Sequence, residues 1–274
     1  MNLEDHAGDV VSKARAMKNI APETAATAAG ISPAQFAEFE QNGKSGAKID
    51  YDALGRAVQI DGKKLERLVG GWLPSAKDLG LWRELRVITS TTSNGMQVHC
   101  YLVWDEVTRD AALFDTGVQP ELIFKIVEEN GLNLKHLFIT HGHYDHVDGL
   151  AAIRDKFPKF HLHTDQKGAL PQHKNRRNDF IMLGSLRITN RETPGHAEDG
   201  ITYVVGNWPE DASSVAIVGD AIFAGSMGGA KGLGDVARTH VREQIFTLPG
   251  DTLICPGHGP VTTVAEEKLN NPFF

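Results

Sequence analysis

The chain has 274 residues and a formal net charge of −7, with 28 Lys and Arg against 35 Asp and Glu. This acidity argues against a general nucleic-acid binder, which needs a basic surface. No apolar run reaches the ~18 residues of a membrane span, and the acidic start lacks the basic and apolar regions of a signal peptide. Two cysteines, Cys100 and Cys255, suggest no disulfide framework. We therefore expect a cytoplasmic protein with one large domain or two smaller ones.

The first 74 residues predict a small all-α domain, followed by a second domain over residues 75–274. Apolar and small residues recur at helical spacing with little strand-like alternation. Ser32-Pro33 is a typical helix start and Asn42-Gly43 a typical helix end. Four or five short helices fit the stretches Val10–Ile20, Glu23–Ala29, Pro33–Gln41 and Tyr51–Val69.

This stretch resembles the small helix-turn-helix domains of Cro/repressor type, with the motif itself at Ala21–Gln41. The resemblance implies operator binding. However, the recognition helix over Pro33–Glu40 carries two acids and no base, and residues 1–74 hold nine Lys/Arg against ten Asp/Glu. Phosphate contacts need cations. We therefore expect the module to pack or to form a homodimer, and we do not expect DNA as a partner.

From Leu85 onward, strand-like and helix-like patches alternate. Strands are expected at Leu85–Thr89, Val98–Trp104, Ala111–Phe114, Leu134–Thr140 and Phe160–His163, and helices at Pro120–Glu129 and Val147–Lys156. Further β-like runs fall at Leu186–Thr189, Val215–Val218 and Thr252–Ile254.

Three imidazoles and a carboxylate stand within six residues at His141–His146, just after the apolar run Leu137–Ile139. Buried polar groups without partners are unfavourable, so such a cluster needs a shared partner. A divalent metal ion suits imidazole and carboxylate ligands. The alternative is an exposed polar loop whose histidines happen to cluster.

Three later segments offer the further ligands that a metal site requires. Each follows or ends a β-like run and has a glycine beside its ligand, which allows a sharp turn and a close approach to the metal. The segments are Thr193–His196, Val218–Asp220 and Cys255–Pro260.

Together these motifs resemble the metallo-β-lactamase superfamily over about residues 85–274, including the strand-and-turn Leu113–Gly117. The resemblance implies an α/β fold, an αββα sandwich with its ligands along one edge of the two sheets. It also implies two divalent metal ions; zinc is the expected metal, and iron and manganese are alternatives. The implied ligands are His141, His143 and His196 for one ion, Asp145, His146 and His258 for the other, and Asp220 as a bridge.

Two such metals can share a hydroxide that attacks an electrophilic carbon or phosphorus, while one of them stabilises the oxyanion. Asp145 and Asp220 would act mainly as ligands, and either can relay a proton to the leaving group. A bridging aspartate is typical of the glyoxalase II, lactonase, phosphodiesterase and RNase Z branches of this superfamily. The segment Gly257–Thr263 most resembles the glyoxalase II branch, the hydroxyacylglutathione hydrolases. The expected function is hydrolysis of a thioester, ester or lactone.

The turn Gly225–Gly229 departs from that branch, because glyoxalase II-like proteins often carry a basic residue at its end that helps to hold glutathione. Here Lys231 comes two residues late, so a glutathione thioester is in doubt. Residues proposed to contact a small-molecule substrate are Tyr144, Lys174, Arg176, Arg177, Ser226 and Lys231.

Two other functions stay open. One is a sulfur dioxygenase of the same superfamily, which keeps this ligand set but binds a single iron ion and uses oxygen. The other is a DNA-binding regulator in which the metal domain senses a ligand.

Overall fold

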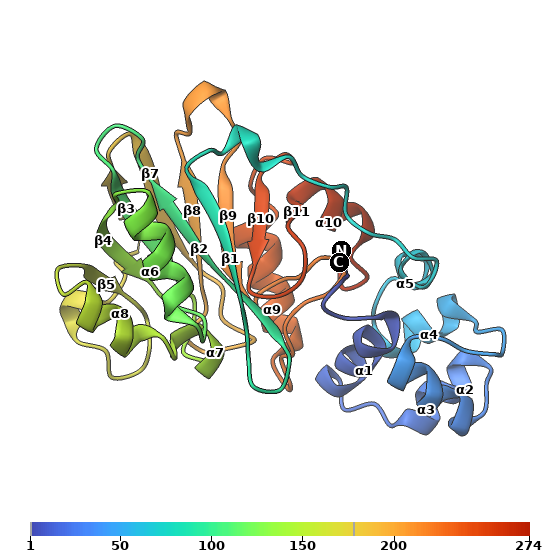
Figure 1. Ribbon diagram of the computed structural model, residues 1–274. Helices are drawn as coiled ribbons and strands as arrows, with labels where there is room; N and C mark the ends of the chain where they lie inside the picture. Colours follow the sequence, from blue (N-terminus) through green and yellow to red (C-terminus); the bar gives the residue numbers. More distant parts are fainter. Residues whose placement is uncertain (1, 178) are drawn as a thin grey trace.

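Two β-sheets face each other in the computed structural model, with helices on their outer surfaces (Figure 1). The structure describes residues 2–177 and 179–274. The first sheet has the strand order β1-β2-β3-β4-β5, with β1 (Leu85–Thr91), β2 (Gln97–Trp104), β3 (Asp110–Phe114), β4 (Asn133–Phe138) and β5 (His161–His163). The second has the order β11-β10-β9-β8-β7-β6, with β6 (Phe180–Leu183), β7 (Leu186–Glu192), β8 (Ile201–Gly206), β9 (Val215–Gly219), β10 (Leu253–Pro256) and β11 (Thr262–Thr263).

Parallel pairing brings distant segments of the chain to one edge of each sheet. In the first sheet β3 and β4 run parallel, with Phe114 opposite Phe138. In the second sheet β9 and β10 run parallel, with Gly219 opposite Pro256. The residues that follow these strands therefore lie side by side although they are far apart in sequence.

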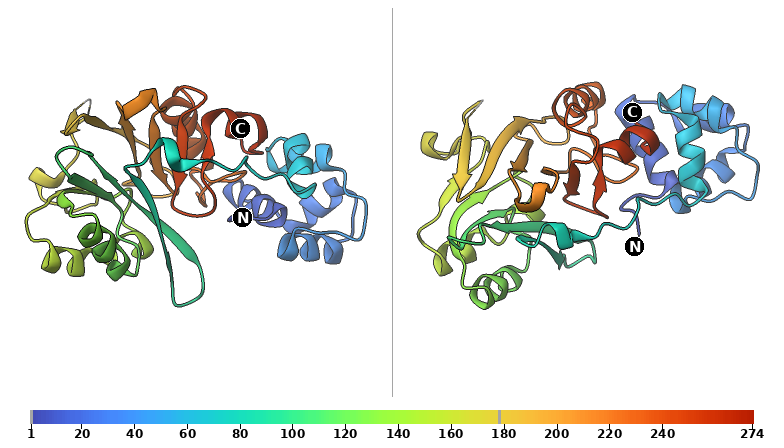
Figure 2. Two further views of the ribbon diagram at one scale, coloured as in Figure 1. Left: turned by 45° about the horizontal axis from the view of Figure 1, so that its top comes forward. Right: turned by 90° about the horizontal axis from the view of Figure 1, so that it is seen from above.

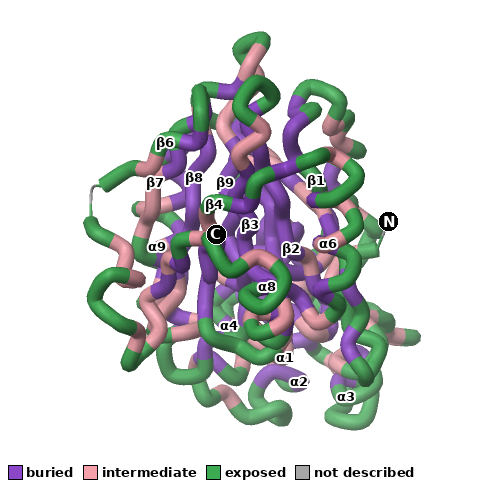
Figure 3. The backbone as a smooth tube through the Cα atoms, turned by 60° about the vertical axis from the view of Figure 1, so that its left-hand side comes forward, coloured by how far each residue is buried: buried purple, intermediate pink, exposed green. Residues whose placement is uncertain are grey.

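The space between the sheets is filled by aromatic and aliphatic side chains. The strands β2, β3, β8 and β9 are accordingly mostly buried (Figure 3). The ring of Phe138 stacks on Phe114 at 4.9 Å and contacts Tyr203 at the same distance. Outside the first sheet lie α6 (Pro120–Glu129) and α8 (Leu150–Lys156), and outside the second lie α9 (Gly234–His240), a π-helical segment (Val241–Ile245) and α10 (Val264–Asn270). This is the αββα arrangement that the sequence predicts, so the predicted fold class is confirmed.

One predicted helix is interrupted, and one of the N-terminal helical stretches forms two helices. The stretch Val147–Lys156 is divided between α7 (Tyr144–Val147) and α8, because the Gly149 N–H donates to Thr116 Oγ1 (3.0 Å) and leaves the helical pattern. The stretch Tyr51–Val69 is divided at Gln59, whose φ of +59° ends the first helix in a left-handed conformation. Among the helices that the structure describes, none is both long and apolar enough to cross a membrane.

Short helices make up the N-terminal module. They are α1 (Ala7–Met17), α2 (Pro22–Ala29), α3 (Pro33–Asn42), α4 (Tyr51–Val58) and α5 (Gly62–Val69). Ser32 caps α3 as expected, accepting from the Gln35 N–H. On α3, the expected recognition helix, Glu38 is exposed and Glu40 pairs with Arg15 at 2.9 Å. The surface of this helix thus offers acids where DNA phosphates would need cations.

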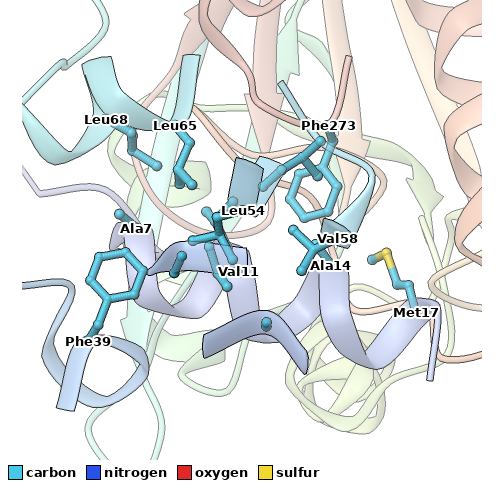
Figure 4. Close-up of a cluster of buried hydrophobic side chains, with 14 of the residues drawn as sticks. Ala7, Val11, Ala14, Met17, Phe39, Leu54, Val58, Leu65, Leu68 and Phe273 are labelled. Carbon is cyan, nitrogen blue, oxygen red and sulfur yellow. The ribbon is translucent and has the colours of Figure 1, made fainter. Parts of the chain in front are cut away.

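The helical module shares its core with the sandwich (Figures 2 and 4). Phe273, near the C-terminus, is buried among side chains of α1, α4 and α5. Both chain ends lie at this junction. Two backbone carbonyls add polar contacts: Pro272 O accepts from the Asp61 N–H (2.8 Å), and Gln59 O accepts from Arg238 (2.7 Å).

Glu267 of α10 is a fully buried carboxyl group at this junction. It accepts hydrogen bonds from the Gly225 N–H (2.9 Å), Thr262 Oγ1 (2.8 Å) and Asn271 Nδ2 (2.9 Å). Burial outweighs these donors and raises the pKa of Glu267 to about 7. Near neutral pH the folded protein therefore holds a proton that the unfolded chain releases.

We predict that Glu267→Gln removes a pH dependence of stability. The stabilisation from the raised pKa is fully present below pH 4.5, the ordinary value, and is lost as the pH rises through about 7. At about 1.4 kcal/mol per pH unit, the loss reaches about 3 kcal/mol. Urea unfolding at pH 5 and pH 8 should show the variant gaining stability relative to wild type at the higher pH. An equal difference at both pH values would contradict the prediction.

Candidate metal centre

The histidine cluster lies at the edge of the first sheet, where β4 ends. His141 follows the strand, His143 caps α7, and Asp145 and His146 lie within α7. The other predicted ligands come from the second sheet, each beyond the end of a strand: His196 after β7, Asp220 after β9 and His258 after β10. The structure brings all seven together.

The first group of donor atoms consists of three imidazole nitrogens. Nδ1 of His143 lies 3.0 Å from Nε2 of His141 and 2.9 Å from Nε2 of His196. Two nitrogens that bind one zinc ion at about 2.0–2.1 Å in a tetrahedron lie roughly 3.3 Å apart. The three rings are therefore spaced closely enough to hold a single ion.

The second group contains Asp145, His146 and His258, and Asp220 joins it to the first. Asp145 Oδ2 lies 3.2 Å from His258 Nε2 and 3.8 Å from His146 Nε2. Asp220 Oδ2 lies 3.5 Å from His258 Nε2 and 3.3 Å from His196 Nε2. Its other oxygen, Oδ1, lies 3.4 Å from His146 Nε2. One carboxylate therefore faces both groups.

Hydrogen bonds to backbone carbonyls fix the orientation of two histidine rings, so that Nε2 of each ring faces the site. Nδ1 of His196 donates to Gly229 O (3.0 Å), and Nδ1 of His258 donates to Gln97 O (2.6 Å). A carbonyl oxygen only accepts, so each neutral ring keeps its proton on Nδ1. The lone pair of Nε2 is then free to bind a metal ion.

Asp115 does the same for two further rings. His146 Nδ1 donates to Asp115 Oδ2 (2.8 Å). The hydroxyl of Thr140 also donates to this carboxylate oxygen (2.8 Å). Because its proton is used there, Thr140 Oγ1 accepts a hydrogen bond from His141 Nδ1 (3.1 Å). Asp115 has a φ of +59°, which is uncommon for a residue with a side chain. In the sequence, Asp115 is recognisable only as part of the strand-and-turn that precedes the histidine cluster. The sequence did not predict that Asp115 orients the rings of His141 and His146.

Two buried atoms at the centre lack hydrogen-bond partners within the described part of the chain: His146 Nε2 and Asp220 Oδ1. Leaving a buried polar atom unpaired costs about 1–3 kcal/mol. A divalent cation would satisfy both atoms, and imidazole with carboxylate suits zinc, iron and manganese. The residues present thus fit a metal centre.

The electrostatics around His146 and His258 favour positive charge, whereas burial lowers the pKa values of His141 and His196. Burial alone would lower the pKa of His146, but Asp115 and Asp220 hold it well above its ordinary value. Burial is likewise outweighed at His258, where Asp145 and Asp220 raise the pKa to about 10. Burial would raise the pKa of Asp220, yet His146 and His258 hold it well below its usual range. The carboxylates stay ionised and attract cations, either protons or metal ions.

The segment after β9, residues 221–229, supports two of the ligands, and we refer to it as the site loop. The Gly228 N–H donates to Asp220 O (3.1 Å). A Cβ atom on Gly228 would lie 2.1 Å from that oxygen and 2.7 Å from His196 Nδ1, so only glycine fits. At Gly229, by contrast, a Cβ would meet no described atom within 4 Å.

The proposed substrate residues lie in different environments. Tyr144 is 65 % exposed, next to the ligands of α7. Ser226 is buried and its hydroxyl donates to Asp5 Oδ2 (2.5 Å), so it faces the N-terminal segment. Lys231 is exposed on the loop that leads to α9.

Of the three basic residues in the loop after β5, Lys174 and Arg177 have partners within the protein. Lys174 Nζ donates to the carbonyls of residues 165–166, at 2.7 and 2.5 Å. Arg177 pairs with Glu192 at 2.6 Å. Arg176 lines a cavity beside Tyr203, between the open edges of the two sheets. Contact of these residues with a substrate stays a prediction.

Comparison with known proteins assigns the chain to a class. Residues 93–264 match the family model of the metallo-beta-lactamase superfamily. Since this match covers more than half of the chain, the protein belongs to that superfamily. The fold and the cluster of histidines and aspartates agree with this assignment.

Relatives with two different activities are similar to it. The hydroxyacylglutathione hydrolase GloC of Haemophilus influenzae is 28% identical over 203 residues, which cover 65% of this chain and 93% of that protein. The mitochondrial persulfide dioxygenase ETHE1 of Bos taurus is 30% identical over 227 residues, covering 80% and 83%. The crystal structure of ETHE1 from Myxococcus xanthus superposes with a TM-score of 0.59 at 31% identity, covering 68% and 83%.

We predict that Gly228→Ala weakens zinc affinity by about 10-fold or more, because the added methyl group displaces Asp220 or His196. Gly229→Ala is the matched control, since a methyl group there points into open space. Competition with a chromophoric chelator measures both affinities. If Gly228→Ala bound zinc as tightly as wild type, the close packing described here would not matter for the centre.

Proposed function

We propose that this protein is a two-metal hydrolase that acts on a thioester, ester or lactone. The observation that carries the proposal is the placement of Asp220, whose two oxygens face both groups of ligands at 3.3–3.5 Å. In this proposal His141, His143 and His196 hold one ion and Asp145, His146 and His258 hold the other, with Asp220 shared.

Two bound divalent ions supply a nucleophile from water at neutral pH and stabilise negative charge on the substrate carbonyl. The protein holds the ligands in place and provides groups for proton transfer. Burial would raise the pKa of Asp145, but the hydrogen bond from His258 outweighs it and the pKa is lowered. Asp145 is thus ionised at neutral pH and able to accept a proton. Tyr144, exposed beside it, can donate a hydrogen bond to the substrate.

The site loop favours a substrate other than a glutathione thioester. Glyoxalase II-like proteins often carry a basic residue at the end of this turn, and the corresponding residue here is Gly229. The nearest basic residue along the chain, Lys231, is exposed two residues later. We therefore propose an acyl substrate that lacks the carboxylates of glutathione.

Introducing a basic side chain at position 229 tests this substrate assignment. We predict that Gly229→Arg raises kcat/KM for glutathione thioesters by about 10-fold, because one charge-assisted hydrogen bond contributes about 1.5 kcal/mol. The space at Gly229 admits a side chain. Gly229→Met is the uncharged control, and a neutral ester should show no gain with either variant. Equal gains for Arg and Met would point to packing rather than charge.

A second candidate is an oxygen-dependent reaction with a single iron ion. The similarity to persulfide dioxygenases, at 30–31% identity, favours it. Two histidines of the first group together with Asp220 would provide the set of two imidazoles and one carboxylate that suits non-haem iron. The ligand residues alone are compatible with either chemistry.

Metal counting combined with activity separates the two candidates. Protein reconstituted with zinc, manganese or iron is analysed by mass spectrometry and assayed on thioesters, lactones, phosphodiesters and β-lactams, with oxygen uptake on a persulfide as the second arm. We expect about two ions per chain and hydrolysis. One iron ion with oxygen uptake would favour the dioxygenase and overturn the hydrolase.

In the active reconstituted form, His143→Ala and Asp220→Ala should each lower turnover at least about 100-fold, because they remove a metal ligand. Circular dichroism should show that the fold is retained, since both side chains lie at the edge of the sheets and outside the apolar core. Unchanged turnover in either variant would reject the proposed centre.

A further inference from the structure

Residues of the N-terminal module reach the site loop directly. Lys13 of α1 donates from Nζ to Asp5 Oδ2 (2.5 Å) and to Met227 O (3.2 Å). Ser226 Oγ donates to the same oxygen of Asp5 (2.5 Å). The ammonium of Lys13 also lies 5.1 Å from the centre of the Phe223 ring. One buried carboxylate thus joins α1 to the site loop.

Lys13 and Asp5 contact Phe223, Ser226 and Met227 of the site loop, next to the residues of this loop that support metal ligands. Immediately after Met227, the N–H of Gly228 donates to Asp220 O and the carbonyl of Gly229 accepts from His196. At the start of the loop, the Phe223 ring packs edge-on against the ring of His258, with centroids 5.7 Å apart. A shift of the site loop would therefore be transmitted to ligands of both groups.

The opposite side of the site loop is held by the C-terminal segment. Asn271 Nδ2 donates to Ser226 O (2.7 Å) and to Phe223 O (3.3 Å), and the Gly225 N–H donates to Glu267. The loop is consequently fixed from two sides. Asp5 and Lys13 supply polar contacts from the helical module, and Leu68 and Trp72 of the same module lie against Gly225 of the loop.

The N-terminal segment also contacts the turn that carries His258. A Cβ on Gly259 would lie 3.0 Å from the Glu4 backbone nitrogen and 3.2 Å from its Cβ. Gly259 has a φ of +72°, so the close approach and the left-handed conformation both require glycine. Residues 4 and 5 therefore lie against two of the loops that supply ligands.

We propose that Asp5 and Lys13 are positioning residues of the metal centre. Through them the helical module contributes to metal binding. The proposal rests on the metal site put forward under the proposed function, and it holds for either reaction considered there. Asp5 and Lys13 act through the site loop on Asp220 and His196.

The character of this contact supports positioning over simple attachment. Apolar packing already joins the module to the sandwich through Met227, Ala230 and Phe273. A buried ion pair adds little net stability, because desolvation offsets the attraction between the charges. Asp5 is only 7 % exposed, and its hydrogen bonds define the position of the loop in a way that apolar contacts do not.

Zinc affinity of the full-length chain, measured by chelator competition, tests the proposal independently of any substrate. Lys13→Met and Asp5→Asn should weaken affinity by about 10-fold, the lower end of the effect of removing a group that supports metal ligands. Lys13→Arg, which keeps the charge, should return affinity toward wild type. Lys18→Met is the matched control: Lys18 is the C-cap residue of α1 and pairs with Asp235 of α9 (2.7 Å), which is largely exposed. Among the described residues neither Lys18 nor Asp235 makes a hydrogen bond to the site loop.

Asp220→Ala completes the set of variants. If Lys13→Met binds zinc like wild type while Asp220→Ala does not, the module only packs against the sandwich and the proposal is overturned. If Asp220→Ala itself binds like wild type, the metal site is wrong and the positioning role falls with it. Should Lys13→Met fail to fold, Ser226→Ala takes its place, since it removes a single hydroxyl; weakened affinity supports the proposal and wild-type affinity overturns it.

Discussion

Five imidazole rings and two carboxylates are gathered at the ends of strands from two sheets, and their need for a shared cation governs the rest of the site. Nε2 of His146 and Nε2 of His258 both face the same carboxylate, Asp220, at 3.4 and 3.5 Å. Without a cation this arrangement leaves buried atoms unsatisfied. The sandwich can tolerate it because the ligands lie at the rim of the sheets, where parallel pairing of β3 with β4 and of β9 with β10 brings them together.

The residues that the structure brings together at the site could be selected from the sequence because their chemistry resides in side chains. His141–His146 are contiguous, and His196, Asp220 and His258 each stand beside a glycine after an apolar run. The groups that orient them could not be predicted in the same way. Gly229 and Gln97 act through backbone carbonyls, which every residue possesses, so no residue type marks them.

Differences in secondary structure also have local causes at the site. The strand expected over Leu134–Thr140 ends at Phe138. The N–H of Thr140 donates to Asp115 Oδ1 (2.7 Å) rather than to a neighbouring strand. Contacts such as Lys13 with Met227 were beyond prediction for another reason, since they join segments at opposite ends of the chain and depend on how the module docks. The substrate could not be predicted either, because its recognition depends on surfaces that several loops form together.

Phe273 makes the packing of the helical module depend on a residue that is far from it in sequence. The helices of residues 7–69 share their apolar core with this phenylalanine, which lies more than 200 residues further along the chain (Figure 4). The core of the module is therefore complete only when Phe273 is in place. Contacts between such distant segments close large loops of chain, and the entropy of loop closure is lost before the contacts form. The module and the sandwich consequently stabilise each other.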